Sequence, residues 1–204
     1  MRAELALQRL KDGNQEFQQL MAAGQVLTSE VTMEQMSSAQ KPFAAILGCS
    51  DSRVPLELIF SQGFGDLFAV RVAGNVVSES QIGSIEFACE QFSTPLVVVL
   101  GHTGCGAIAA TVDGLMQSAS IPSPNLKHIV DLLEPAVSGV LEGEGDRESF
   151  IKQATRASVQ RSVNTILRKS AVLKALAERG DIIVVGAEYD IVSGKVDFFA
   201  PSDD

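Results

Sequence analysis

Three side chains of different chemistry stand two positions apart at Cys49, Asp51 and Arg53. They directly follow an apolar run, residues 43–47, which is too short for a helix and is bounded by a proline and a glycine. This pattern predicts a buried strand. In open α/β sheets, ligands bind beyond the carboxyl ends of the strands. At alternating positions of an extended segment, a thiol, a carboxylate and a guanidinium can all point to one side of a site.

A second motif supplies further metal-ligating groups. His102 and Cys105 are separated by two residues and follow another apolar run, residues 96–100. Together with Cys49 they form a set of two thiolates and one imidazole at the ends of two strands. Catalytic zinc sites have three protein ligands and an open fourth position, whereas structural sites are closed by four. The two motifs therefore predict a catalytic zinc centre.

Asp51 and Arg53 are suited to assist a nucleophile at that centre. Zinc lowers the pKa of bound water toward ~7, but two thiolates donate more electron density than imidazoles and oppose the effect. An ionised Asp51 accepts a hydrogen bond from zinc-bound hydroxide, and Arg53 forks onto the carboxylate and keeps it ionised. If Asp51 turned onto zinc, hydroxide could not bind, so the same residues also allow an inactive state. The alternative is a surface ion pair of little consequence.

The elements that must position these motifs are typical of an α/β fold. Apolar, β-branched runs predict four strands, at residues 43–47, 67–72, 96–100 and 182–185. A turn at Ser193–Gly194 returns the chain as an edge strand over residues 196–199. We therefore expect a central, mostly parallel sheet of four strands plus an antiparallel edge strand, flanked by helices.

Helical patterns fill the intervals between the strands. They are predicted over residues 3–22, 55–60, 79–92, 106–117, 126–141 and 149–178, with a short one near 33–38. The positive end of the helix that begins at Gly106 favours thiolate over thiol at the second motif. We expect one domain over residues 1–204, with residues 1–41 as an N-terminal helical arm, because no repeat or linker divides the chain.

Composition argues against several kinds of partner. The net charge of −9 disfavours nucleic acid or an anionic membrane surface. No apolar run approaches the ~20 residues of a membrane span. Three cysteines fit metal binding or buried thiols in a reducing compartment, and Cys89 lies in an apolar helical pattern typical of a core residue. We expect a cytoplasmic protein, or a periplasmic one if a leader is removed.

The two motifs resemble those of the β-class carbonic anhydrases. Residues 49–55 read CSDSRVP and residues 102–107 read HTGCGA. Residues 66–77 (DLFAVRVAGNVV), 83–89 (GSIEFAC) and 186–196 (GAEYDIVSGKV) are also similar to that family, in the same order, so the resemblance covers nearly the whole chain. It implies one Zn²⁺ per chain and reversible hydration of CO₂ to bicarbonate and a proton. It further implies a homodimer or homotetramer with the pocket at a dimer interface.

The resemblance also implies a substrate pocket. Gln40 stands nine residues before the first cysteine, where the family has a substrate-orienting Gln. The apolar pocket positions of the family carry over to Phe68, Ala73 and Phe87. CO₂ has no dipole, so a dry apolar wall suits it. Many members have Tyr where Phe87 stands, and the hydrogen bond of that hydroxyl is therefore missing here.

The family divides into open and closed types according to the position of the Asp. The closed, bicarbonate-inhibited type resembles a pattern with Trp three residues before the first cysteine. Ile46 occupies that position, and the chain contains no Trp. We therefore expect an open enzyme, with Asp51 off the metal and activity at neutral pH.

Two other functions are compatible with these motifs. One is hydrolysis of carbonyl sulfide or carbon disulfide at the same zinc site, which relatives of this fold perform; the width of the pocket at Phe68 and Phe87 would decide. The other is a redox or zinc-storage module that uses Cys49 and Cys105. The second leaves the placement of the carboxylate and guanidinium unexplained.

Overall fold

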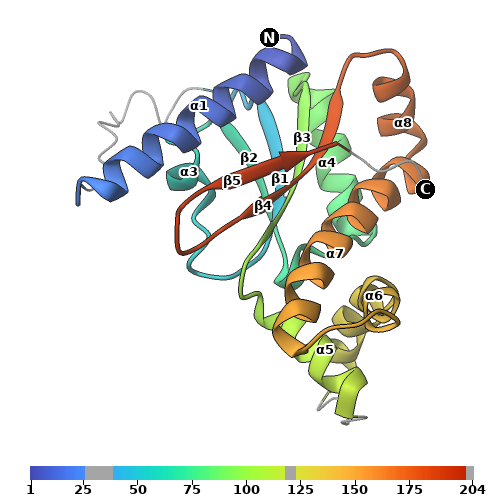
Figure 1. Ribbon diagram of the computed structural model, residues 1–204. Helices are drawn as coiled ribbons and strands as arrows, with labels where there is room; N and C mark the ends of the chain where they lie inside the picture. Colours follow the sequence, from blue (N-terminus) through green and yellow to red (C-terminus); the bar gives the residue numbers. More distant parts are fainter. Residues whose placement is uncertain (26–38, 118–122, 201–204) are drawn as a thin grey trace.

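The computed structural model describes residues 1–25, 39–117 and 123–200 of the chain (Figure 1). The short helix expected near residues 33–38 lies outside the described residues. From the first strand to the third, strands and helices alternate along the described part of the chain; four helices then precede the last two strands. This alternation is typical of an α/β architecture built on a parallel sheet.

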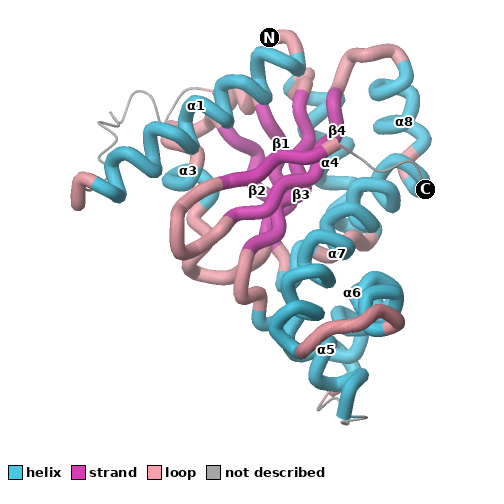
Figure 2. Tube along the Cα trace, viewed as in Figure 1, coloured by secondary structure: helices cyan, strands magenta, loops and turns pink. Residues whose placement is uncertain are grey.

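Five strands of the described residues form one sheet (Figure 2). They are β1 (Ala44–Gly48), β2 (Leu67–Arg71), β3 (Leu96–His102), β4 (Ile183–Tyr189) and β5 (Val196–Phe199). Their order is β2-β1-β3-β4-β5, and among them the β4–β5 pair alone is antiparallel. The predicted fold class is therefore confirmed. Gly48 lies opposite Arg71 of β2 and Leu100 of β3, so the carboxyl ends of three strands meet at one edge.

Helices cover both faces of this sheet. They are α1 (Ala3–Ala22), α3 (Leu56–Ile59), α4 (Glu79–Phe92), α5 (Gly106–Gln117), α6 (Pro124–Leu141), α7 (Arg147–Lys169) and α8 (Ala171–Glu178). A short 3₁₀ turn, η1 (Ala73–Asn75), follows β2. The bounds of α1, α4 and α5 are those predicted from the sequence.

The prediction of one continuous helix over residues 149–178 is wrong. The chain is extended at Ser170, with φ −106° and ψ 106°, and this residue separates α7 from α8. The Ser170 hydroxyl accepts a hydrogen bond from the backbone N–H of Leu173 at 3.0 Å. A serine in this position caps the following helix, because it satisfies a backbone donor that the first helical turn leaves free. The helical spacing of apolar residues continues across Ser170, so the sequence pattern did not reveal the break between the two helices.

The strands divide the apolar side chains between two layers, as their alternation requires. Ile46 and Val98 pack on the side of α1 and α3, whereas Leu47 and Val99 pack on the side of α4, α7 and α8. Figure 1 shows this arrangement, with α1 crossing one side of the sheet and α7 and α8 on the other. The middle strands are buried on both faces, which explains their continuous apolar runs.

Helix α1 is fixed to the core of its own chain. The buried Asn14 side chain donates to the carbonyls of Ile59 and Gly194, at 3.1 and 2.8 Å, and accepts from the N–H of Val196 at 2.9 Å. A Cβ on Gly13 would lie 1.9 Å from the carbonyl oxygen of Phe60. Glycine is therefore required where α1 meets the segment that follows α3.

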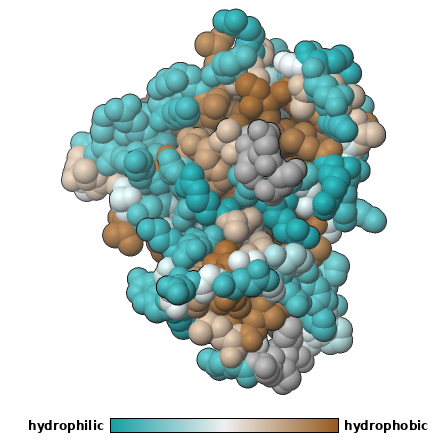
Figure 3. All heavy atoms as spheres, turned by 45° about the vertical axis from the view of Figure 1, so that its right-hand side comes forward, coloured by the Kyte–Doolittle hydropathy of each residue, from teal (hydrophilic) through white to brown (hydrophobic). Residues whose placement is uncertain are grey.

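The molecular surface includes exposed apolar side chains. On the face shown in Figure 3, apolar groups form one patch in the upper half of the molecule and another toward the end formed by α5 and α6. Met116 and Leu126 on these two helices are each about half exposed. Within the described residues, every helix is too short or too polar to cross a bilayer.

Candidate metal centre

The fold brings three potential metal ligands together at the carboxyl edge of the sheet. Cys49 directly follows β1, His102 ends β3, and Cys105 immediately precedes α5. All three are buried, and their ligand atoms lie within 4.8 Å of one another. The parallel pairing of β1 with β3 causes this convergence, because it aligns the ends of the two strands.

The imidazole of His102 is oriented as a metal ligand would be. Its Nδ1 lies 3.0 Å from the carbonyl oxygen of Thr103, a contact that assigns the proton to Nδ1 and the lone pair to Nε2. Nε2 is buried and has no hydrogen-bond partner among the described residues. Buried polar atoms are almost always paired. An Nε2 that bonds a metal while Nδ1–H donates to a carbonyl is the usual arrangement in zinc proteins.

The two thiols share an environment that favours a bound cation. A hydrogen bond from Cys105 lowers the pKa of Cys49, and the backbone N–H of Gly74 supports the same sulfur at 3.3 Å. The same bond to Cys49, together with burial, raises the pKa of Cys105. One proton is thus held between two sulfurs, and a divalent ion that binds both thiolates would displace it. The donor set fits zinc.

Asp51 and Arg53 form a forked ion pair beside this cluster. The Arg53 backbone N–H and Nε both donate to Asp51 Oδ1 at 2.9 Å, and Nη2 donates to Oδ2 at 2.7 Å. These hydrogen bonds hold the pKa of Asp51 well below its usual range. Oδ2 also lies 3.9 Å from His102 Nε2, so the carboxylate faces the ligand cluster. Arg53 Nη2 further donates to the carbonyl of Gly104 at 3.2 Å, which links the two motifs.

The residues of the expected substrate pocket lie in two separate places. Ala73 begins η1 and precedes Gly74, whose N–H contacts a ligand sulfur, so Ala73 lies near the cluster. Phe68 pairs in register with Ala45, toward the amino end of β1, and its ring packs against Phe87 at 6.2 Å between centroids. Neither aromatic residue is brought to the cluster of its own chain.

Gln40 also lies away from that cluster. It is exposed and precedes β1, whereas Cys49 follows this strand, so the two stand at opposite ends of it. Its Cα lies 3.7 Å from the position that a Cβ on Gly65 would take. Gln40, Phe68 and Phe87 therefore share the amino end of the β1–β2 pair.

Some residues that shape the site lie within the quoted segments, but the sequence assigned them no role. Thr103 donates its backbone N–H to the carbonyl of Tyr189 at 2.9 Å, and its hydroxyl accepts from the N–H of Ile191 at 3.1 Å. The β4–β5 turn thereby holds the second motif. Gly74 adopts a left-handed conformation, with φ 66°, that presents its N–H to Cys49. A glycine after β2 was visible in the sequence, but its target sulfur was not.

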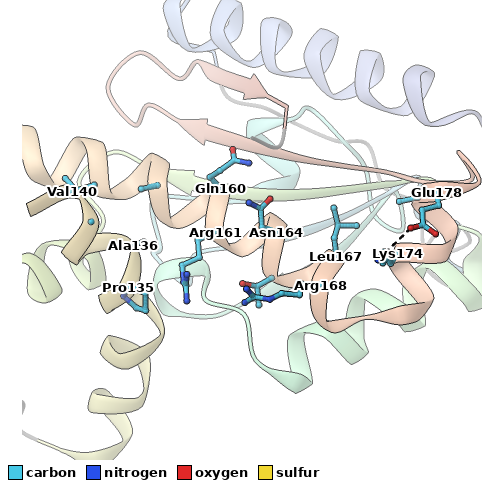
Figure 4. Close-up of a pocket in the computed structure, with 14 residues that line it drawn as sticks. Pro135, Ala136, Val140, Gln160, Arg161, Asn164, Leu167, Arg168, Lys174 and Glu178 are labelled. Atoms are coloured by element: carbon cyan, nitrogen blue, oxygen red, sulfur yellow. Dashed lines mark ion pairs between the residues drawn. The ribbon is translucent and has the colours of Figure 1, made fainter. Parts of the chain in front are cut away.

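A groove in the protein surface lies apart from the metal cluster. It is a groove of about 960 Å³ between α6, α7 and α8, and Figure 4 shows Arg161 and Arg168 of α7 beside it. Lys174 and Glu178 on its rim form an ion pair at 3.8 Å. None of the residues that line this groove is one of the three potential metal ligands or a member of the Asp51–Arg53 pair. This groove is therefore separate from the chemical site.

Comparison with known proteins agrees with the geometry. The family model described as carbonic anhydrase matches residues 44–196. A carbonic anhydrase of Mycolicibacterium smegmatis is 37% identical over 196 residues, which cover 94% of this chain and 91% of the relative. Carbonic anhydrase 2 of Mycobacterium tuberculosis is 33% identical over 193 residues, covering 93% and 89%.

Solved structures give the same result. The β-carbonic anhydrase CcaA superposes with a TM-score of 0.73 at 27% identity, covering 97% of this chain and 92% of that one. One of the tetrameric β-carbonic anhydrases of Sordaria macrospora gives 0.71 at 25% identity, covering 81% and 84%. The match of the family model, the two mycobacterial relatives and the shared fold together show that this chain belongs to the β-class carbonic anhydrase family.

Proposed function

We propose that this chain catalyses the reversible hydration of CO₂ to bicarbonate and a proton, with Zn²⁺ bound by Cys49, His102 and Cys105. The observation that carries the proposal is the convergence of these three ligand atoms within 4.8 Å beside the Asp51–Arg53 pair. Zinc in such a site supplies a water whose pKa is lowered far enough to provide a nucleophile near neutral pH.

The two oxygens of Asp51 have different tasks in this proposal. Oδ1 accepts two hydrogen bonds from Arg53, whereas among the described residues Oδ2 accepts one. A carboxylate oxygen can accept two. Oδ2, which also faces His102 Nε2, therefore retains a lone pair for the hydrogen of the attacking oxygen. That bond leaves a lone pair of the attacking oxygen directed at the carbon of CO₂.

We further propose that the enzyme is of the open type. Arg53 engages both oxygens of Asp51, so the carboxylate is directed to the guanidinium. The low pKa of Asp51 keeps it ionised throughout the neutral range, in which state it can only accept hydrogen bonds. An Asp51 oxygen found ~2.0 Å from zinc at neutral pH would refute this assignment.

We also propose that a second copy of the chain completes the pocket. Gln40, Phe68 and Phe87 lie at the amino end of the β1–β2 pair, and Phe87 is 51% exposed. Exposed aromatic side chains are common where proteins associate. In a homodimer, or a homotetramer built from it, these residues would contribute the orienting amide and apolar wall to the partner's zinc. The relevant relatives from Sordaria macrospora are tetrameric.

The test is stopped-flow CO₂ hydration by the zinc-loaded protein, with and without a chelator, at about pH 7 and about pH 8.5. We expect one zinc per chain, activity at both pH values, and loss of activity when zinc is removed. A protein that binds zinc but does not accelerate hydration would overturn the proposal. Carbonyl sulfide assayed in parallel separates the two possible substrates of the same site.

A further inference from the structure

Arg71 contacts the first catalytic motif from the neighbouring strand. It is the last residue of β2 and lies opposite Gly48, where β1 ends. Its Nε donates to the carbonyl of Cys49 at 3.0 Å, and its Nη2 donates to the carbonyl of Asp51 at 2.7 Å. One guanidinium thus holds two backbone carbonyls on either side of Ser50.

Backbone hydrogen bonds alone connect the end of β2 to only the first residues of the loop that follows β1. Val72 N–H donates to the carbonyl of Gly48 at 3.2 Å, and Ser50 N–H donates to the carbonyl of Val72 at 3.3 Å. Among the described residues, backbone bonds between the loop and the end of β2 stop at Ser50. Beyond that point, Arg71 provides the bond from β2 to Asp51.

The orientation of the Asp51 backbone determines where its carboxylate can reach. The direction of the Asp51 Cα–Cβ bond is set by the two peptide planes that flank its Cα, Ser50–Asp51 and Asp51–Ser52. Arg71 restrains the second of these planes through the carbonyl of Asp51, and it restrains the preceding Cys49–Ser50 plane through the carbonyl of Cys49. The carboxylate already lies close to the ligand cluster, with Oδ2 3.9 Å from His102 Nε2. A modest rotation of the loop would therefore bring it to the metal position.

We infer that Arg71 is a positioning residue that keeps the fourth coordination position free, because it fixes the backbone from which Asp51 reaches Arg53. Two arginines thus restrain one aspartate: Arg53 holds the carboxylate, and Arg71 holds its main chain. This inference rests on the proposed function, since it concerns the same metal site.

The test uses cobalt(II)-substituted protein and azide, which binds an open coordination position and changes the visible spectrum. Wild type, Arg71→Ala and Arg71→Lys are titrated at one neutral pH. If the fraction of sites with an open position falls to about a tenth in Arg71→Ala, the azide dissociation constant rises about tenfold. Lysine cannot donate to both carbonyls in the forked geometry of arginine, so the azide dissociation constant of Arg71→Lys should lie between those of wild type and Arg71→Ala. Arg147→Ala, which removes an exposed forked arginine elsewhere, should match wild type.

A double variant separates positioning from general damage. If Arg71→Ala acts by releasing the Asp51 carboxylate onto the metal, adding Asp51→Asn removes the competing ligand and restores azide binding. An azide constant for both Arg71 variants within about twofold of wild type would overturn the inference. So would a weakened constant that Asp51→Asn does not restore. If Arg71→Ala does not fold, Arg71→Lys carries the same comparison. A wild-type enzyme inactive toward CO₂ would refute the proposed function but leave the azide comparison valid.

Discussion

Replacement of Arg53 by alanine tests the proposed mechanism most directly. The substitution removes two of the three hydrogen bonds that Asp51 receives from Arg53 and leaves the backbone N–H bond to Oδ1. Oδ2 then has no partner among the described residues and is free to turn toward the metal position. The Arg53 side chain is 54% exposed, so we expect little change in the free energy of unfolding.

The expected loss of activity follows from orientation rather than from charge. Without Arg53, the pKa of Asp51 returns toward the ordinary value of about 4, and the carboxylate remains ionised at neutral pH. A misplacement of about 1 Å in the groups that orient a reaction can cost about 10²-fold in rate. Because one of three hydrogen bonds remains, we expect kcat/KM for CO₂ hydration to fall about 10²-fold. Arg53→Lys, which cannot fork, should retain an intermediate activity.

Arg147 provides a matched control for this experiment. It forks onto Asp113 through Nε at 2.6 Å and Nη2 at 2.7 Å, and its side chain is 55% exposed. Arg147→Ala should therefore resemble Arg53→Ala in stability while leaving kcat/KM unchanged. Stopped-flow assays and urea unfolding of the zinc-loaded variants supply both readouts. If Arg53→Ala keeps more than about a third of the wild-type kcat/KM, the assigned role of this pair is refuted.

Three further predictions concern the metal and the core. Cys105→Ser should retain less than about a tenth of an equivalent of zinc in atomic absorption, because a catalytic site has only three protein ligands. Gly101→Ala should destabilise the protein by about 1–3 kcal/mol in urea unfolding, since the added Cβ would lie 2.6 Å from a methyl of Val159; Gly114→Ala, with open space around it, should stabilise by about 0.5–1 kcal/mol. Burial raises the pKa of Cys89 from 9.0 to about 12, so the unfolded chain loses that proton first and stability falls as pH rises above 9.0. Cys89→Ala should therefore remove about 1 kcal/mol of the decline measured up to about pH 10.

The sheet could be predicted from the sequence because its middle strands are buried on both faces. β3 is buried along its whole length, and its run of valines permits no amphipathic helix. The division between α7 and α8 could not be predicted in the same way. Both helices present apolar residues to one side of the sheet, so the pattern continues across Ser170. A capping hydrogen bond at Ser170 starts α8 there, and serine in a helical pattern is too common to indicate such a cap.

In the site, too, some residues could be predicted from the sequence and others could not. The ligand residues were recognisable because cysteine and histidine at strand ends have few other roles. Arg71 was not, because a strand-end arginine in an acidic protein is usually a solvated charge. Its role depends on register: only the pairing of Gly48 with Arg71 places the guanidinium beneath the carbonyls of Cys49 and Asp51. Sequence spacing contains no information about that pairing.

The two-residue interval between Asp51 and Arg53 has a physical reason of its own. At this spacing the backbone N–H of Arg53 reaches Oδ1 of Asp51, as in an Asx turn, while its side chain reaches both oxygens. One residue therefore supplies three donors, and the carboxylate is oriented locally before any distant contact forms. The convergence of Cys49 with His102 instead requires the parallel register of β1 and β3. A change that shifts this register should abolish metal binding while leaving the Asp51–Arg53 bonds intact. Insertion of one residue between Asp51 and Arg53 should instead break those bonds and leave metal binding intact.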